Sequence, residues 1–161
     1  MDSKKYIHYK KRTRLKDFDY KGCYRYFITL CTFDKKAVFT DEALVSWFVD
    51  VLKEKSTSLG FGIWAYCFMP DHLHLFVEGK KDDSDLKQFI ASYKQYTAFH
   101  YKKRDKKELW QMNFYDHVLR KEEDTINIAN YVFNNPVRKG LVSDYKNYKF
   151  LGSFEFDVMQ T

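Results

Sequence analysis

The chain has 161 residues, of which 45% are hydrophobic and 31% are charged, and its net charge is +6. This composition is typical of a globular protein and excludes a disordered polymer, so we expect a single domain over residues 1–161. Three widely separated cysteines argue against a zinc ribbon or a disulfide framework. The apolar runs are too short for a membrane span, and we expect a cytoplasmic protein with no membrane partner.

Basic residues are concentrated near the N-terminus, in the stretch KKYIHYKKRTRLK at residues 4–16. A block of like charge at a chain end is often a solvated arm, and that simple explanation remains open here. The aromatic residues between the lysines also suit contact with phosphates and bases. We expect a basic arm at about residues 1–20. The nucleic-acid contacts that we predict within it are Lys10, Lys11, Arg12 and Arg14.

The first half of the chain predicts a strand, a helix and a two-stranded hairpin. These elements cover residues 24–33, 41–60, 61–69 and 73–78. The strands are rich in β-branched and aromatic residues, whereas the helix repeats apolar residues with a helical period. Thr40 is a candidate N-cap of the helix, and Pro70 and Asp71 are typical of the turn in the hairpin.

The second half predicts a helix, a strand, a further helix and a last strand. These elements cover residues 84–104, 114–120, 122–135 and 148–156. Ser84 is a candidate N-cap, and Pro136 should end the later helix because the residue before proline disfavours the helical region. The order of elements predicts an α+β fold, a ferredoxin-like or RRM-like antiparallel sheet with helices packed on one face. The other face would then be free for a ligand.

Two histidines interrupt the apolar run YCFMPDHLHLFVEG at residues 66–79. Side chains at positions i and i+2 of a strand point to the same face, so His72 and His74 should stand together while Leu73 and Leu75 face the core. Two neutral imidazoles on a rigid strand supply two ligands of a divalent metal site with open positions. The simpler alternative is a pair of polar histidines on an exposed sheet face.

The helix at residues 84–104 offers partners for this pair. Tyr96 and His100 lie four residues apart and therefore on one face of the helix, so a nucleophile and a third metal ligand could come from the same element. Tyr93 falls on the apolar face and suits packing, and Tyr101 is a further rival. Tyr96 could equally be an ordinary half-buried aromatic residue.

Such a set suits cleavage of a phosphodiester by a phenol. A metal held by His72, His74 and His100 could activate the phosphorus and stabilise the leaving 3′ oxygen. Tyr96 would become joined to the 5′ phosphate, and this bond conserves the energy needed to rejoin the strand. Because a phenol has a pKa of about 10, a metal or a basic neighbour such as Lys94 would have to assist its deprotonation.

The sequence also resembles a known family. FMPDHLHLFVE is similar to the histidine–hydrophobic–histidine (HUH) motif of single-tyrosine transposases of the IS200-like family. LWQMNFYDHVLRKEED and YVFNNPVRKGLV resemble segments that mark the REP-associated tyrosine transposase branch, and the resemblance extends roughly from Arg12 to Val142. The order of the three segments is more specific than the HUH motif alone.

The resemblance implies an RRM-like fold, dependence on Mg²⁺ or Mn²⁺, and cleavage of single-stranded DNA near hairpins or palindromes by a nucleoid-associated enzyme. It implies that His72 and His74 bind metal and that Tyr96 on SYKQYTAFH is the nucleophile. The third ligand of the superfamily follows the tyrosine by one turn and is often an amide, whereas here that position is His100. Both monomers and dimers are compatible with the resemblance.

Further residues match the family segments without a settled role. Asp116 and His117 could form an acid–base pair, but a structural hydrogen-bond network is the favoured interpretation. Arg120 falls on the same segment and is a candidate DNA contact. Arg138 and Lys139 follow a helix stop at Asn135 and Pro136 and could contact phosphate.

Two other functions compete with a transposase. An RRM-like sheet can bind single-stranded RNA or DNA without catalysis, but the sequence lacks a clear RNP pattern and a binder needs no paired histidines. A metal-dependent nuclease that uses water in place of tyrosine is the third possibility.

Overall fold

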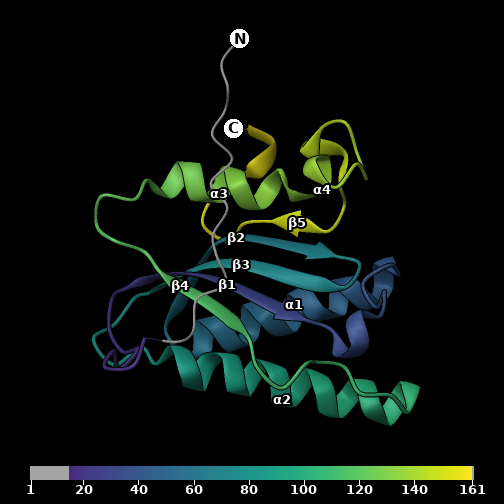
Figure 1. Ribbon diagram of the computed structural model, residues 1–161, viewed down its shortest axis with the longest axis horizontal. Coiled ribbons are helices and arrows are strands. Elements are labelled where there is room, and N and C mark those ends of the chain that lie inside the picture. Colours follow the sequence, from purple (N-terminus) through teal and green to yellow (C-terminus); the bar gives the residue numbers. More distant parts are fainter. Residues whose placement is uncertain (1–14, 161) are drawn as a thin grey trace.

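A computed structural model of the chain describes residues 15–160 (Figure 1). The predicted arm lies mostly outside these residues, so the predictions for Lys10, Lys11, Arg12 and Arg14 lie outside the described residues. The described elements are β1 (Arg25–Cys31), α1 (Glu42–Ser58), β2 (Phe61–Met69), β3 (His72–Gly79), α2 (Leu86–Asp105), β4 (Tyr115–Val118), α3 (Thr125–Phe133), α4 (Asn135–Arg138) and β5 (Leu151–Gly152), with short 3₁₀ helices at Phe33–Lys35, Tyr145–Asn147 and Val158–Gln160.

The sheet is antiparallel and has the strand order β4-β1-β3-β2-β5. Its first four strands and the helices α1 and α2 reproduce the ferredoxin-like order, which confirms the predicted fold class. The short β5 extends the sheet at the β2 edge. The hairpin between β2 and β3 turns at Pro70 and Asp71, as the sequence predicted.

Each face of the sheet carries its own hydrophobic core. Helices α1 and α2 pack on one face, where they bury Leu73 and Leu75 of β3. Helix α3 covers the other face and packs Val132 and Phe133 against Phe76 of β3. Figure 1 shows the two layers, with α1 and α2 below the sheet and α3 and α4 above it. The second face is therefore partly covered, whereas the sequence had suggested that it would be free.

The N-cap of each long helix lies one residue later than predicted. Asp41, not Thr40, caps α1, because its carboxylate accepts a hydrogen bond from the Leu44 amide at 2.8 Å. Asp85, not Ser84, caps α2 through the Gln88 amide at 3.1 Å. The Ser84 hydroxyl instead donates to the Gly60 carbonyl at 2.7 Å. In each case an aspartate stands beside the hydroxyl residue and takes the capping position.

The C-terminal part differs more from the prediction. Helix α3 ends at Phe133, and the chain starts the short helix α4 at Asn135 with Pro136 in its first turn. Proline is well tolerated there because the first amides of a helix have no partner within it. The predicted last strand at residues 148–156 forms ladder bonds only at Leu151 and Gly152.

Candidate active site on the histidine face

His72 and His74 lie side by side on β3, as the sequence predicted. Their Nε2 atoms are 3.1 Å apart, and their rings meet edge to face at a centroid distance of 4.6 Å. Both point to the face that α3 covers, because Leu73 and Leu75 are buried under α1 and α2 on the opposite face. The two nitrogens therefore converge on one point, as ligands of a single ion would.

The far nitrogen of each imidazole is held by a neighbour. His72 Nδ1 lies 2.6 Å from Asp71 Oδ1, and His74 Nδ1 lies 2.9 Å from the hydroxyl of Thr29 on β1. A carboxylate that accepts the Nδ1 proton leaves the Nε2 lone pair of His72 available for a ligand bond. Metal-binding histidines are usually oriented by such a hydrogen bond from the ring nitrogen that does not bind the metal.

His74 is set up to stay neutral. Its ring stacks on Phe27 at a centroid distance of 5.4 Å, which removes water from one side. Burial, with further contributions from His72, Arg138 and Lys139, holds the pKa of His74 well below its usual value. At neutral pH the imidazole is therefore unprotonated and can act as a ligand.

Tyr96 and His100 do not join this pair. The Tyr96 ring stacks on Trp47 of α1 at a centroid distance of 6.4 Å, and His100 also contacts Trp47. Because α1 and α2 cover the face opposite the histidines, the sheet separates Tyr96 and His100 from His72 and His74. The predicted convergence of these four residues is therefore wrong. Sequence spacing placed Tyr96 on a helix face but could not tell which side of the sheet that helix would cover.

Tyr131 on α3 is the phenol that the structure brings to the histidine face. Its ring meets Phe27 edge to face at 5.8 Å, and Phe27 in turn stacks on His74. The guanidinium of Arg138 lies 4.0 Å from the centre of the Tyr131 ring. Tyr115 on β4 shares this face as well, since it pairs with Thr29, which pairs with His74. No role for either tyrosine was predicted from the sequence.

Asn135 lies four residues after Tyr131, at the start of α4. Its side chain is buried, and its amide nitrogen has no hydrogen-bond partner among residues 15–160. Such an orphan is uncommon inside a protein and often marks the place of an unbound ligand. Since the two ends of an amide are nearly indistinguishable, the same side chain can present its oxygen there.

The type of a third ligand can also be narrowed. Within the described part of the chain, no three His, Cys, Asp or Glu side chains gather in a way that could hold a metal ion. A third protein ligand beside His72 and His74 would therefore be of another type, and an amide oxygen is one that Mg²⁺ and Mn²⁺ accept.

The predicted DNA contacts separate into two groups. Arg138 and Lys139 lie close enough to His74 for their positive charges to contribute to its lowered pKa. Lys94 lies on α2, where its ammonium donates to the carbonyls of Gln111 and Met112 at 2.7 and 3.1 Å. It thus holds the segment before β4 and is separated from the histidine pair. Arg120 is exposed in the loop that precedes α3.

A hydrogen-bond network fixes that loop to the sheet. The Arg25 guanidinium on β1 donates to the Glu123 carbonyl and the Thr125 hydroxyl at 2.8 Å each, and to the Arg120 carbonyl at 2.7 Å. His117 Nε2 lies 3.1 Å from the nearer carboxylate oxygen of Glu123. Asp116 points to the opposite face, because its partner Ile28 is buried in the α1–α2 core. Asp116 and His117 therefore form no acid–base pair, in line with the structural role favoured from the sequence.

Comparison with known proteins places the chain in a family. The model of the IS200-like transposases matches residues 20–135. The chain belongs to this family, and the matched residues include the HUH motif and the first four strands of the sheet. Helices of the length and apolarity that a bilayer crossing requires are absent from residues 15–160.

The branch within the family follows from individual relatives. A Haemophilus influenzae protein assigned to the REP-associated tyrosine transposases is 30% identical over 155 residues, which cover 89% of this chain and 85% of that protein. The REP-associated tyrosine transposase of Escherichia coli is 28% identical over 99 residues, covering 61% and 57% of the two chains. A REP-associated tyrosine transposase solved with a REP hairpin has the same fold, with a TM-score of 0.71, 20% identity and coverage of 87% and 82%. These matches confirm the predicted branch.

Proposed function

We propose that the chain is a divalent-metal-dependent enzyme that cleaves and rejoins single-stranded DNA near hairpins through a 5′-phosphotyrosine intermediate on Tyr131. Membership of a transposase family supports action on DNA, and a fold neighbour is bound to a REP hairpin. The observation that carries the proposal is the shared face: the imidazoles of His72 and His74, the ring of Tyr131 and the buried amide of Asn135 all belong to the α3 side of the sheet.

His72, His74 and Asn135 are the residues that would hold Mg²⁺ or Mn²⁺. Two convergent Nε2 atoms fit a metal site, and the unpartnered amide fits a third ligand that follows the nucleophile by one turn. The resemblance implies this spacing between nucleophile and amide, and Tyr96 does not meet it because the residue four positions later is His100. A bound ion would supply Lewis-acid activation of the phosphorus and stabilise the leaving oxygen.

The chain's own groups define the remaining steps. The Tyr131 oxygen attacks the phosphorus and loses its proton to solvent, the bond from phosphorus to the 3′ oxygen breaks, and that oxygen takes up a proton. Attack by a 3′ hydroxyl on the phosphotyrosine reverses these changes and joins the strands. Two basic residues supply positive charge for the phosphate: Arg138, which lies over the Tyr131 ring, and the next residue in the chain, Lys139.

The experiment is a denaturing gel of the full chain mixed with a single-stranded hairpin oligonucleotide and Mn²⁺. The wild type should form a covalent protein–DNA band, and Tyr131→Phe should reduce it more than ~1,000-fold, because a phenyl ring has no nucleophilic oxygen. Tyr96→Phe and Tyr115→Phe are the matched controls and should change it less than about twofold.

Other patterns would select other functions. An adduct that persists in Tyr131→Phe and disappears in Tyr115→Phe would move the nucleophile to β4. Cleavage without an adduct in every variant would indicate a water-dependent nuclease. Retarded migration on a native gel without any cleavage would indicate a non-catalytic binder.

A further inference from the structure

We propose that a pocket between α1 and α2, on the side of the sheet opposite the histidines, binds one unpaired nucleotide of single-stranded DNA and prefers a base with an exocyclic amine. The proposal depends on the proposed function only in that the chain handles single-stranded DNA. It assigns a second contact to that strand, remote from the bond that is cut.

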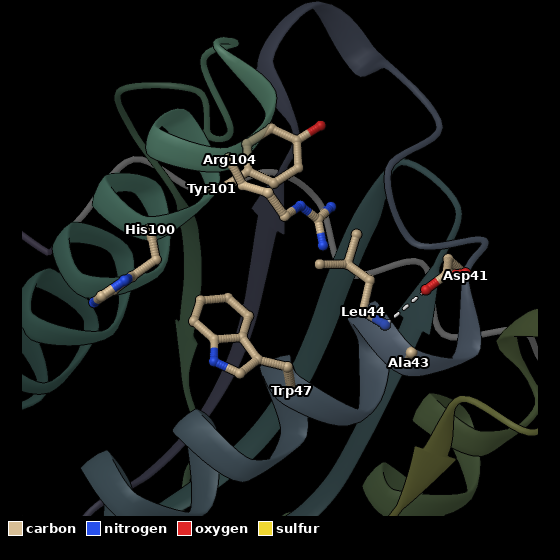
Figure 2. A pocket seen from close by; sticks show the side chains of 7 residues that line it. All are labelled: Asp41, Ala43, Leu44, Trp47, His100, Tyr101 and Arg104. Carbon is tan, nitrogen blue, oxygen red and sulfur yellow. Dashed lines mark hydrogen bonds between the residues drawn. The ribbon is translucent and has the colours of Figure 1, made fainter.

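The pocket has a volume of about 350 Å³, within the ~300–1,000 Å³ typical of small-ligand sites. Residues from the first turns of α1 form one wall, and the last turns of α2 form the other. Figure 2 shows the flat side of the Trp47 indole below the guanidinium of Arg104, with Leu44 and Asp41 across from Tyr101. The pocket thus combines an aromatic plane, a cation and a carboxylate.

The aromatic plane continues outside the pocket. Trp47 stacks on Tyr96 with an interplanar angle of 23°, and the Tyr96 and His100 rings lie 4.5 Å apart. Tyr96 is 37% exposed and Phe99 is 65% exposed, although both are large aromatic residues. In proteins that bind single-stranded nucleic acids, successive bases usually stack on exposed aromatic rings of this kind.

Positive charge accompanies these rings. The ammonium of Lys55 lies 4.6 Å from the centre of the Tyr96 ring, and the last turn of α2 carries Lys102, Lys103 and Arg104. Basic residues at a helix C-terminus also stabilise the helix dipole, which explains their presence in part. That role does not require a guanidinium at the wall of a pocket, and Arg104 lines the pocket (Figure 2). A phosphodiester matches this charge, whereas an uncharged partner would not.

Asp41 gives the pocket a preference among bases. Its Oδ1 accepts the capping hydrogen bond from Leu44, and a carboxylate has a second oxygen that can accept another. Cytosine, adenine and guanine present an exocyclic amine to such an acceptor, whereas the ring donor of thymine is an imino group flanked by two carbonyl oxygens, which repel a carboxylate. The Arg104 guanidinium binds Asp105 through Nε, so its terminal nitrogens face the pocket for a phosphate or a base oxygen.

The test measures binding without cleavage. The probe is fluorescein-labelled oligo-dC or oligo-dT of about ten nucleotides, bound to the Tyr131→Phe chain in EDTA and followed by anisotropy. Oligo-dC should bind more tightly than oligo-dT. Trp47→Leu and Arg104→Gln should each weaken oligo-dC binding by ~5-fold or more, and Trp47→Phe should restore most of the affinity because it keeps a stacking ring.

Asp41→Asn is the sharpest variant, because asparagine caps a helix as well as aspartate does. It replaces an acceptor by a side chain that can also donate, so the preference for oligo-dC should vanish or reverse. Lys53→Gln is the matched charge control; its ammonium lies over Phe154, away from the pocket, and it should change neither affinity by more than about twofold.

Photocrosslinking locates the contact independently of folding effects. An oligonucleotide with 5-iodocytosine should crosslink to the peptide that contains Trp47 or to the one that contains Tyr101. Crosslinks confined to other peptides, or an Asp41→Asn chain with the wild-type base preference, would overturn the proposal. A sedimentation experiment would also overturn it if Trp47→Leu dissociated a dimer without changing DNA affinity. The pocket would then be an interface with a second copy of the chain. Loss of the covalent adduct in Tyr131→Phe is a separate readout, so the two proposals fail independently.

Discussion

The two sides of the sheet carry similar residues in different arrangements. On the α1–α2 side, Tyr96 and His100 form an exposed aromatic cluster with Trp47. On the α3 side, His72 and His74 present two Nε2 atoms to one point, and each far nitrogen has its own partner. A tyrosine next to a histidine is therefore not enough to identify a reaction site. What distinguishes the α3 side is that neighbours fix both imidazoles and that an unpartnered buried amide lies on the same side of the sheet.

The largest difference between the two sides should appear when a histidine is removed. His74→Ala should lower cleavage in Mn²⁺ by at least ~100-fold, because one metal ligand is lost. His100→Ala, on the other side, removes no metal ligand and should change the cleavage rate at saturating oligonucleotide less than about twofold. The measurement is the rate of oligonucleotide cleavage on a denaturing gel. Equal losses in both variants would contradict the separation of the two sides.

Asn135 sharpens the comparison, because its loss should affect metal binding and not folding. Asn135→Ala should weaken Mn²⁺ binding about 10–100-fold in a titration followed by electron paramagnetic resonance. Its melting temperature should stay within a few degrees of the wild type, since the amide nitrogen has no protein partner to lose. Asn135→Asp keeps a ligand oxygen and should retain most of the affinity. A large loss of stability with unchanged Mn²⁺ affinity would assign Asn135 to the core instead.

The partner of His74 should have a smaller effect. Thr29→Val keeps the shape of the side chain and its preference for strands but removes the hydroxyl that lies 2.9 Å from Nδ1. We expect Mn²⁺ affinity to fall about 10-fold, the lower end of the effect of an outer-shell partner. Thr57→Val, at an exposed position of α1, is the control and should leave the affinity unchanged. The same fall in both variants would exclude a role for the hydroxyl.

The smallest expected effect concerns alkaline stability. Burial raises the pKa of the Cys67 thiol to about 12, well above the ~8.5 of an unfolded chain. The thiol therefore stabilises the fold fully below pH ~8.5, and this contribution is lost as the pH rises toward 12, since only the unfolded state releases the proton.

Urea titrations of the wild type and Cys67→Ala at several pH values measure this contribution. The wild type should lose free energy of unfolding faster than the variant above pH ~8.5, so that the gap between them narrows. A gap that stays constant from pH 8 to pH 11 would show that Cys67 is not protected from ionisation.

The order of the elements along the chain and the histidine pair could be predicted from sequence because each follows from a local rule. Alternation along a strand put His72 and His74 on one side, and apolar periodicity located α1 and α2. The partner of the pair could not be found in this way, because it depends on which side of the sheet each helix covers. Tyr96 and His100 are four residues apart, as are Tyr131 and Asn135. The sequence therefore does not distinguish the two pairs, and only the packing of the helices on the sheet shows which pair lies on the side of the histidines.

One sequence signal pointed to α3, the helix that covers the histidine side. The segment YVFNNPVRKGLV, which resembles the family, contains a tyrosine followed four residues later by an amide. The sequence predicts one helix over residues 122–135 that Pro136 ends, so a second helix that begins at Asn135 is not expected. In the structure the proline instead lies in the first turn of α4, and the amide before it is buried.

The three hydrogen bonds of Arg25 also bear on how the molecule could move. They fasten the residues just before α3 and its first turn to a central strand, whereas Tyr131 lies near the other end of that helix. If α3 rotated during exchange of DNA strands, its N-terminal end at Thr125 would therefore stay in place. Tyr131, near the other end of the helix, would undergo the largest displacement. Arg25→Lys cannot bond to all three oxygens at once. It would therefore make this end of α3 more mobile without changing any group that reacts.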